Sequence, residues 1–419
     1  MNFEPFNFHP HIQAGITAAG YETPTPIQVQ AIPPLLQGRD ILGLAQTGTG
    51  KTAAFGLPIL QRLMSGPRGR LRTLILSPTR ELAEQTHIAL RNLGRKAGLR
   101  SITLYGGVSQ QPQVKALQAG TEIAVACPGR LLDLVNQRLI DLKGIEMLVL
   151  DEADMMFDMG FLPDIRRILA LLPVQRQTML FSATMPAEIR GLATDMLKNP
   201  VTIEIGSSKP VETVQQTVLP VDQERKYELL LQLLPQTGEG QVLVFTRTKH
   251  RAQKVARLLS QAGHSAVSLQ GNLSQNRRQA AMDGFRSGRV KVMVATDIAA
   301  RGLDVSQVTH VINYDMPNTA VAYTHRIGRT GRAERLGTAL TLATHEDHLM
   351  IRSIERLLGR PLARKQVEGF EPVPQSLQIE TPQPAAPLRR PSSAPSRPQS
   401  NQRPAAANRP GTQTSRFRR

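Results

Sequence analysis

Short, continuous apolar runs alternate with longer amphipathic stretches along the first half of the chain. A representative amphipathic stretch, 80–98, carries apolar residues at the three- and four-residue spacing of a helix. Continuous apolar runs are typical of parallel strands covered on both faces, so the alternation predicts a doubly wound α/β sheet. The predicted strands are 40–44, 72–77, 121–126, 146–150 and 178–182.

The same alternation returns in the second half and predicts a second domain of the same class. Between the halves, residues 206–216 are rich in Gly, Ser and Pro, a composition that favours a linker. A chain of 419 residues is also too long for one ordinary core. We therefore expect domains at 1–206 and 217–362, joined by a linker at 207–216. The second set of predicted strands is 241–246, 265–270, 290–296, 310–315 and 338–344.

The end of the chain, 363–419, is predicted to be a disordered, Pro- and Arg-rich tail. From Pro372 onward it has few large apolar side chains and cannot bury enough surface to offset its ordering entropy. Eight arginines against one acid, Glu380, give this part about +7 of the net charge of +18. A flexible basic arm for RNA, a contact for protein partners and an inert solubilising tail are all compatible with this composition.

The net charge of +18 and the pI near 10.8 suggest a polyanionic partner, although a basic solvated surface gives the same numbers. Aromatic residues make up only 4% of the chain and tryptophan is absent, so we expect a nucleic acid to be held by its backbone rather than by base stacking. A single cysteine, Cys127, excludes an intramolecular disulfide framework. No apolar run reaches the roughly 20 residues of a membrane span, and the start lacks a signal-peptide pattern. These features predict a soluble, cytoplasmic protein.

The segment "AQTGTGKT" at 45–52 follows a predicted strand and precedes a predicted helix. Gly48 and Gly50 allow backbone N–H groups to surround phosphates at the positive end of that helix. Lys51 can reach the β- and γ-phosphates, and the Thr52 hydroxyl can ligate Mg²⁺. Ala45 stands where the plain phosphate loop has glycine. The predicted phosphate-binding residues are Ala45, Gln46, Thr47, Gly48, Thr49, Gly50, Lys51 and Thr52.

Three carboxylates follow the predicted strand 146–150: Asp151, Glu152 and Asp154. Favourable acids at a helix N-terminus account for one or two of them. In a chain with a phosphate loop, a neighbouring strand also delivers a carboxylate to Mg²⁺, which prefers hard oxygen ligands. We assign that role to Asp151, acting through bound water, and we expect Glu152 to orient or deprotonate the attacking water.

Together these motifs resemble the DEAD-box RNA helicase family, and most closely its bacterial RhlE-type branch. The resemblance runs from Phe3 to about Arg360. It implies two tandem RecA-like domains, ATP and Mg²⁺ as cofactors, and RNA-stimulated ATP hydrolysis. It also implies a structured or ribosomal RNA partner that is not recognised by sequence. The supporting motifs are GYETPTPIQ (20–28), AQTGTGKT (45–52), PTREL (78–82), GG (106–107), PGR (128–130), DEAD (151–154), SAT (182–184), VFTRT (244–248), QNRR (275–278), ATDIAARGLDV (295–305) and HRIGRTGR (325–332).

The resemblance makes residues 1–29 an adenine-recognition segment. The Gln28 amide offers the donor and acceptor that adenine N6 and N7 require, and Tyr21 or Phe3 is expected to cover the ring. The family's preference for ATP over GTP follows from this segment. By the same resemblance, Asp304 meets the ATP ribose, with Gly302 beside it.

The coupling residues are assigned by the same resemblance. The hydroxyls of the SAT motif suit hydrogen bonds to Asp154 and His325, and Ser182 and Thr184 then couple hydrolysis to RNA binding. The HRIGRTGR motif spaces its arginines by three, so we expect one helical turn to project them together. Arg326 joins the coupling group, and Arg329 and Arg332 are candidate arginine fingers.

The expected RNA contacts are residues whose donors suit phosphate oxygens. Helix capping or surface charge explains any one of them equally well. Cys127 replaces a family threonine, and because a thiol is a poorer donor, that phosphate contact is expected to be weaker. Gln270 stands where relatives often carry histidine. The candidates are Thr79, Arg80, Gly107, Arg130, Gln275, Arg278 and Thr296.

Three functions remain compatible with these motifs. Opening about five duplex steps costs roughly 7 kcal/mol, which one closure can supply, so an RNA helicase is expected to unwind short duplexes locally and without processivity. The alternatives are an ATP-gated RNA clamp or assembly factor and, less well supported, a DNA translocase.

Overall fold

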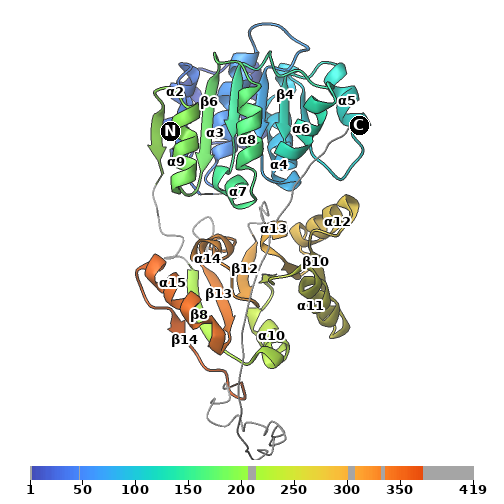
Figure 1. Ribbon diagram of the computed structural model, residues 1–419, viewed down its shortest axis with the longest axis vertical. Helices are drawn as coiled ribbons and strands as arrows, with labels where there is room; N and C mark the ends of the chain where they lie inside the picture. The colour runs from blue at the N-terminus through green and yellow to red at the C-terminus, as the bar shows by residue number, and fades with distance from the viewer. Residues whose placement is uncertain (1, 47, 206–213, 301–306, 332–335, 371–419) are drawn as a thin grey trace, which may run out of the picture. The chain divides into compact units, whose positions relative to one another are not determined.

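The computed structural model (Figure 1) describes residues 2–46, 48–205, 214–300, 307–331 and 336–370. Two seven-stranded parallel sheets, each with flanking helices, account for nearly all of them. This confirms the predicted fold class of two tandem doubly wound domains. No helix within these ranges is long and apolar enough to cross a bilayer.

The first sheet has the strand order β3-β4-β2-β5-β6-β1-β7, and all its neighbouring pairs are parallel. The central strands are buried along their whole length, as their continuous apolar runs require. The strands are β1 (Ile41–Leu44), β2 (Thr73–Leu76), β3 (Ser101–Leu104), β4 (Ile123–Ala126), β5 (Met147–Leu150), β6 (Gln177–Ser182) and β7 (Val201–Glu204).

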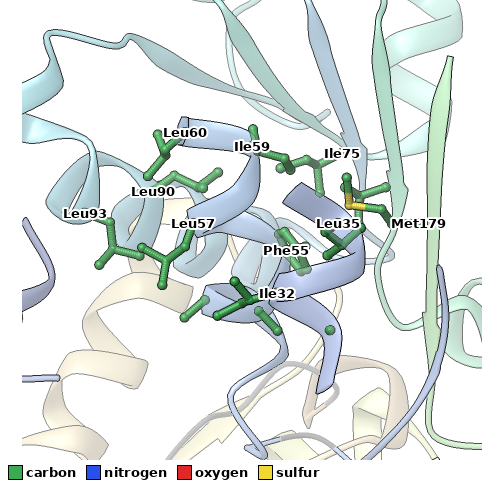
Figure 2. Close-up of a cluster of buried hydrophobic side chains, with 14 of the residues drawn as sticks. Ile32, Leu35, Phe55, Leu57, Ile59, Leu60, Ile75, Leu90, Leu93 and Met179 are labelled. Atoms are coloured by element: carbon green, nitrogen blue, oxygen red, sulfur yellow. The ribbon is translucent and has the colours of Figure 1, made fainter. Parts of the chain in front are cut away.

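Helices cover both faces of this sheet. On one face, shown in Figure 2, side chains of the helices Pro26–Leu36, Lys51–Leu63 and Arg80–Leu93 pack against strand residues such as Ile75 and Met179. A second apolar cluster lies on the other face. The helices are α1 (Pro10–Ala18), α2 (Pro26–Leu36), α3 (Lys51–Leu63), α4 (Arg80–Leu93), α5 (Gln111–Gln118), α6 (Pro128–Asn136), α7 (Ala153–Asp158), α8 (Leu162–Ala170), α9 (Ala187–Met196), and the 3₁₀ turns η1 (Glu4–Phe6) and η2 (Arg95–Ala97).

The second sheet has the order β10-β11-β9-β12-β13-β8-β14 and is also parallel. Its strands are β8 (Val214–Pro220), β9 (Gln241–Phe245), β10 (Ala266–Leu269), β11 (Val292–Ala295), β12 (Val308–Asn313), β13 (Gly337–Ala343) and β14 (Ala363–Arg364). Its helices are α10 (Lys226–Leu233), α11 (Lys249–Gln261), α12 (Gln275–Arg286), α13 (Asp297–Ala300), α14 (Ala320–Ile327), α15 (His348–Leu358), and the 3₁₀ turns η3 (Gln223–Arg225), η4 (Leu234–Thr237) and η5 (His345–Asp347).

Because all strands of a sheet run in parallel, their carboxyl ends meet at one edge. In the first domain the loops leaving that edge carry nearly every motif. The phosphate loop follows β1, PTREL follows β2, GG follows β3, PGR follows β4, DEAD follows β5, and SAT spans the end of β6. Ligands of open α/β sheets bind at this edge.

Two boundaries differ from expectation. β8 begins at Val214, so the last three residues of the predicted linker belong to a strand, while 206–213 lie outside the described residues. The predicted start of the disordered tail at 363 is wrong, because β14 pairs with β8 and Phe370 is buried in the second domain's core. The Arg225 guanidinium also lies over the Phe370 ring, 4.5 Å from its centroid. Residues 371–419 lie outside the described ranges.

Candidate nucleotide and RNA site

The phosphate loop has the backbone shape that its glycines predict. Gly48 and Gly50 have φ of +89° and +95°, in the left-handed region that glycine enters without strain. A Cβ at Gly50 would lie 2.6 Å from Gln28 Nε2 and 2.7 Å from Thr25 Oγ1, so any larger residue would displace that segment. α3 begins at Lys51 directly after the loop, and its N-terminus is therefore available to an anion.

Lys51 connects the phosphate loop to the DEAD motif. Its Nζ lies 2.8 Å from Glu152 Oε1 and donates to Ala45 O at 3.0 Å, and both charged side chains are buried. Burial alone would lower the pKa of Lys51, but the carboxylates of Glu152 and Asp151 outweigh it and raise the pKa. The ammonium therefore stays charged, and with three N–H donors it has one for a phosphate besides these two partners.

The DEAD carboxylates are buried beside that ammonium. Glu152 has φ +54° and ψ +55°, a left-handed conformation that is rare for residues other than glycine and that clusters at functional sites. Burial, and next the charge of Glu152, raise the pKa of Asp151. Its Oδ1 is buried and accepts no hydrogen bond from any residue in the described ranges. A buried carboxylate oxygen in this position fits a cation.

The residues present fit Mg²⁺, which in phosphate sites keeps several waters and takes one or two protein oxygens. Asp151 supplies a carboxylate oxygen, and Thr52 supplies a hydroxyl in the first turn of α3. The described residues contain no group of three or more His, Cys, Asp or Glu arranged to hold a metal by themselves.

The last DEAD carboxylate is tied to the SAT motif, as expected. Asp154 Oδ2 accepts from Thr184 N at 2.8 Å and from Thr184 Oγ1 at 2.9 Å. Ser182 acts differently, because its Oγ accepts from the Asp154 backbone N–H at 3.2 Å and donates to Thr184 O at 2.7 Å. The two hydroxyls therefore join the carboxyl ends of β5 and β6.

The adenine-recognition segment closes over the phosphate loop. Gln28 uses both ends of its amide on the protein, because Oε1 accepts from Thr25 N at 3.0 Å and Nε2 donates to Gly50 O at 3.1 Å. Each end keeps one further hydrogen-bonding position for a base. A pocket beside it is lined by residues of 20–28 and by Gly48 and Gly50. Tyr21 lines this pocket and is 37% exposed.

Phe3 occupies a different position from Tyr21. It is only 2% exposed and does not line that pocket. Its ring is stacked against Tyr21, with centroids 6.3 Å apart and planes 27° apart. Of the two aromatic candidates, Tyr21 is therefore the one that presents its ring to the pocket, and Phe3 supports it.

In the second domain, the expectation that one helical turn projects the arginines of HRIGRTGR is wrong. α14 ends at Ile327 with Gly328 as its C-cap, so only Arg326 lies within the helix. Arg326 is buried and pairs with Asp297 through Nε and Nη2, at 2.5 and 2.7 Å. It also lies over the Phe245 ring, 5.0 Å from its centroid.

Arg329 follows the helix and donates from Nε to His325 O at 3.3 Å. These two residues line a small pocket with Arg326 and Asp297. The remaining nucleotide candidates, Thr47, Gly302, Asp304 and Arg332, lie outside the described residues.

Three RNA candidates of the first domain meet around the loop 105–109. The Arg80 guanidinium lies so close to Gly107, which has φ +78°, that a Cβ there would be 2.3 Å from Arg80 Nη2. Arg130 donates from Nη2 to Val108 O at 3.2 Å. Thr79, by contrast, caps α4, because its hydroxyl accepts from Leu82 N at 3.3 Å.

The RNA candidates of the second domain sit at helix starts. Gln275 is the first residue of α12. Arg278, one turn later, is buried and donates from Nη1 to Gln270 O at 3.2 Å. The Thr296 carbonyl accepts from Ala300 N and so closes the first turn around α13. The side-chain capping that the alternative interpretation predicted is therefore present at Thr79, whereas α12 is capped by Ser274 and not by an RNA candidate.

Comparisons with known proteins agree with this geometry. The DEAD/DEAH box helicase family matches residues 25–192, and the helicase conserved C-terminal domain matches 225–334. The DEAD-box ATP-dependent RNA helicase CshA of Bacillus subtilis is 40% identical over 365 residues, covering 87% of this chain and 74% of that protein. The chain belongs to the DEAD-box RNA helicase family.

Other DEAD-box relatives extend this match. RNA helicase CrhR of Synechocystis is 44% identical over 358 residues, covering 84% of this chain and 72% of that protein. S. cerevisiae Dbp5 bound to RNA and ADP BeF3 superposes with a TM-score of 0.78 at 31% identity, covering 88% and 96% of the two chains. The chain is an ATP-dependent RNA helicase that binds nucleotide and RNA. These relatives do not specify the RhlE-type branch, which stays an expectation.

One residue of this DEAD-box chain joins the candidate site although the sequence did not indicate it. Gln113 is 7% exposed, and its Nε2 donates at 3.1 Å to Tyr105 O in the loop 105–109. The segment SQQPQ carries three glutamines, and nothing in their spacing distinguishes the third.

Proposed function

We propose that this DEAD-box helicase hydrolyses ATP between its two domains and uses RNA-stimulated closure to separate short duplexes locally. The main support for this proposal is the buried cluster at the carboxyl edge of the first sheet. In it Lys51 pairs with Glu152, beside Asp151 Oδ1, which has no hydrogen-bond partner among the described residues. A relative in the same family has been captured with RNA and ADP BeF3, which supports joint binding of both ligands.

The protein groups have distinct roles in hydrolysis. The glycine loop and Lys51 hold the triphosphate, and Glu152 orients the attacking water and accepts its proton. Mg²⁺ held by Thr52 and Asp151 would neutralise charge on the phosphate oxygens. The Gln28 amide and the Tyr21 ring select adenine.

Coupling requires the second domain. Arg329 and Arg332 are the proposed arginine fingers, a device worth on the order of 10³–10⁵ in rate. Asp304 is the proposed contact to the ATP ribose, with Gly302 beside it. On the first domain, the hydrogen bonds from Thr184 to Asp154 fix the DEAD helix relative to the SAT loop, and we assign coupling to this link with Ser182, His325 and Arg326.

Because ATP and RNA favour the same closed state, each must strengthen binding of the other by the same factor. The proposed RNA contacts are Thr79, Arg80, Gly107 and Arg130 on the first domain and Gln275, Arg278 and Thr296 on the second. They are backbone-directed donors, so structured RNA, including ribosomal RNA, is bound without base recognition. We place this activity in the cytoplasm, with the basic tail as an additional contact for RNA or protein partners.

The energy of one closure limits the length of duplex that is opened. About five steps at about 1.4 kcal/mol each require roughly 7 kcal/mol, taking DNA stacking as a proxy for RNA. A duplex of several turns costs several times more, so its strands should not separate in one cycle. The proposed helicase therefore acts locally and without processivity.

The test is ATPase activity with and without RNA, beside strand displacement from short and long duplexes. We expect strong RNA stimulation in the wild type and near-background rates in Lys51→Ala and Glu152→Gln. Displacement should fall steeply as the duplex lengthens, and rates that stay constant over many turns would contradict local unwinding. RNA-stimulated ATP hydrolysis without any strand displacement would favour the ATP-gated RNA clamp over the helicase. Stimulation of the ATPase by single-stranded DNA equal to that by RNA would favour the DNA translocase.

A further inference from the structure

α5 contacts the rest of the first domain through apolar side chains, which are partly buried, and through one buried polar side chain. Gln113 is the only residue of this helix that is buried, at 7% exposure, and the structure describes the helix from end to end. Its Nε2 donates to Tyr105 O at 3.1 Å and lies 3.5 Å from Ser109 O, while its Oε1 accepts from Arg130 Nη1 at 3.2 Å. One amide therefore bridges the two ends of the loop after β3 and the arginine after β4.

Arg130 is held from three directions by these neighbours. Besides Gln113, its Nη2 donates to Val108 O at 3.2 Å, and its Nε lies 3.6 Å from the Asp133 carboxylate. The guanidinium has five N–H donors, so hydrogens remain for a phosphate after these contacts are made. The contacts fix the plane of the guanidinium, and with it the direction of the remaining donors.

The same loop also determines where Arg80 can lie. Gly107 faces the Arg80 guanidinium at a distance that leaves no room for a Cβ. A shift of the loop 105–109 would therefore move the surface against which Arg80 packs. Since Gln113 binds the loop at Tyr105 and Ser109, it holds this surface at both ends.

We propose that Gln113 is a positioning residue for RNA binding, which sets Arg130 and the loop 105–109 in the arrangement that grips the RNA backbone. This inference rests on the RNA-binding role proposed above for Arg80, Gly107 and Arg130. A side chain that is fixed before its ligand arrives does not lose rotamer freedom on binding, so losing the bridge weakens affinity without removing any group that touches RNA.

The perturbation is Gln113→Met, which keeps the length of the side chain and removes both hydrogen-bonding ends. The matched control is Gln118→Met, the same change at an exposed position of the same helix. The steady-state ATPase rate of the full chain is measured as a function of RNA concentration and, separately, of ATP concentration. We expect the RNA concentration for half-maximal stimulation to rise about tenfold in Gln113→Met. The KM for ATP, and kcat at saturating RNA, should stay within twofold of wild type.

A double-mutant cycle separates positioning from loss of fold. In an Arg130→Ala background, Gln113→Met should weaken RNA affinity less than it does in the wild type, because the guanidinium that Gln113 orients is gone and only its contacts to the loop 105–109 remain to be lost. The slope of log affinity against log salt should stay at its wild-type value in the single Gln113→Met variant, because every group that contacts a phosphate is still present. In Arg130→Ala it should fall by about 0.7, the change expected when one phosphate contact to single-stranded RNA is lost.

The inference is overturned if Gln113→Met keeps the wild-type half-saturation for RNA, or if its loss is equally large with and without Arg130. Should Gln113→Met melt far below wild type, Gln113→Asn replaces it, because that side chain keeps the amide but is too short to bridge. These outcomes all presuppose a wild-type enzyme that RNA stimulates. Failure of the proposed function would appear separately, as absence of stimulation in the wild type itself.

Discussion

The amino ends of the strands in the first sheet are held by an ion pair whose removal has a calculable cost. Arg72, 4% exposed, donates to the Glu146 carboxylate from Nε at 2.8 Å and from Nη2 at 2.9 Å, and from Nη1 to Ser65 O at 2.8 Å. Glu146→Gln leaves this guanidinium buried without its counter-charge. We therefore expect the first domain to lose stability.

The magnitude follows from burial. Breaking a fully buried pair costs about 3–5 kcal/mol, but the Glu146 side chain is 29% exposed, so we reduce the expected cost to about 2 kcal/mol. For a domain of this size that lowers Tm by about 4–8 °C. The matched control is Arg70→Gln, which removes the other arginine on the same carboxylate. The Arg70 side chain is 56% exposed, and its Nη2 lies 3.3 Å from Glu146 Oε1. Exposed ion pairs contribute at most about 1 kcal/mol to stability, so this variant should lose less.

The stability lost in Glu146→Gln should depend on pH, and the shifted pKa of Glu146 gives the direction of that dependence. Hydrogen bonding to Arg72, aided by its charge, lowers the pKa of Glu146 below its ordinary value of 4.5. A carboxyl with a lowered pKa contributes stability that is fully present above its unfolded pKa and is lost as the pH falls through its folded value. The difference between wild type and Glu146→Gln should therefore be constant from pH 6 to 8 and shrink below pH 4.5.

Calorimetry of the full chain at pH 7 and at pH 4 measures both effects. A Glu146→Gln melting temperature within 1 °C of wild type at pH 7, or an equal loss at both pH values, would refute the reasoning. ATP and RNA affinities should not change, because this pair lies at the edge of the sheet opposite the phosphate loop.

Three further predictions concern the site itself. Gly50→Ala should lower ATP affinity more than tenfold by nucleotide titration while the protein stays folded, because a Cβ at φ +95° would strike Gln28. Burial raises the pKa of the Cys127 thiol to about 12, so its alkylation rate, followed by mass spectrometry, should stay low from pH 7 to 9 and rise only in denaturant. Thr184→Val removes one of two hydrogen bonds to Asp154 Oδ2 and should lower strand displacement more than ATP binding; equal losses in the two assays would argue against coupling through this bond.

The buried strands were the most predictable elements, and the edge strands were not. All five predicted strands of the first sheet exist, because continuous apolar runs signal burial on both faces. β3 and β7 were missed because they are edge strands whose residues are partly exposed, so their sequences lack that signal. β8 was missed for another reason, since its Gln-rich start resembles a linker.

At the site, residue types were predictable but their partners were not. The chemistry of the phosphate loop pointed to Lys51 and the DEAD carboxylates as candidates. The spacing of these residues in the sequence could not show that Lys51 forms an ion pair with Glu152. Arg326 illustrates the limit: its motif suggested a shared arginine surface, but a bidentate bond to Asp297 buries it inside its own domain. Such pairings depend on side chains far apart in sequence, which periodicity does not report.

Both candidate ligand loops of the first domain use the same physical arrangement. A glycine in the left-handed region gives each loop its shape, at Gly50 and at Gly107, and a buried glutamine fixes that shape through both ends of its amide. Gln28 joins Thr25 N to Gly50 O, and Gln113 joins Tyr105 O to Arg130. A hydroxyl is too short for such a bridge, and a carboxylate cannot donate. A buried amide can satisfy a donor and an acceptor at once, so each loop keeps its shape without an unpaired buried charge.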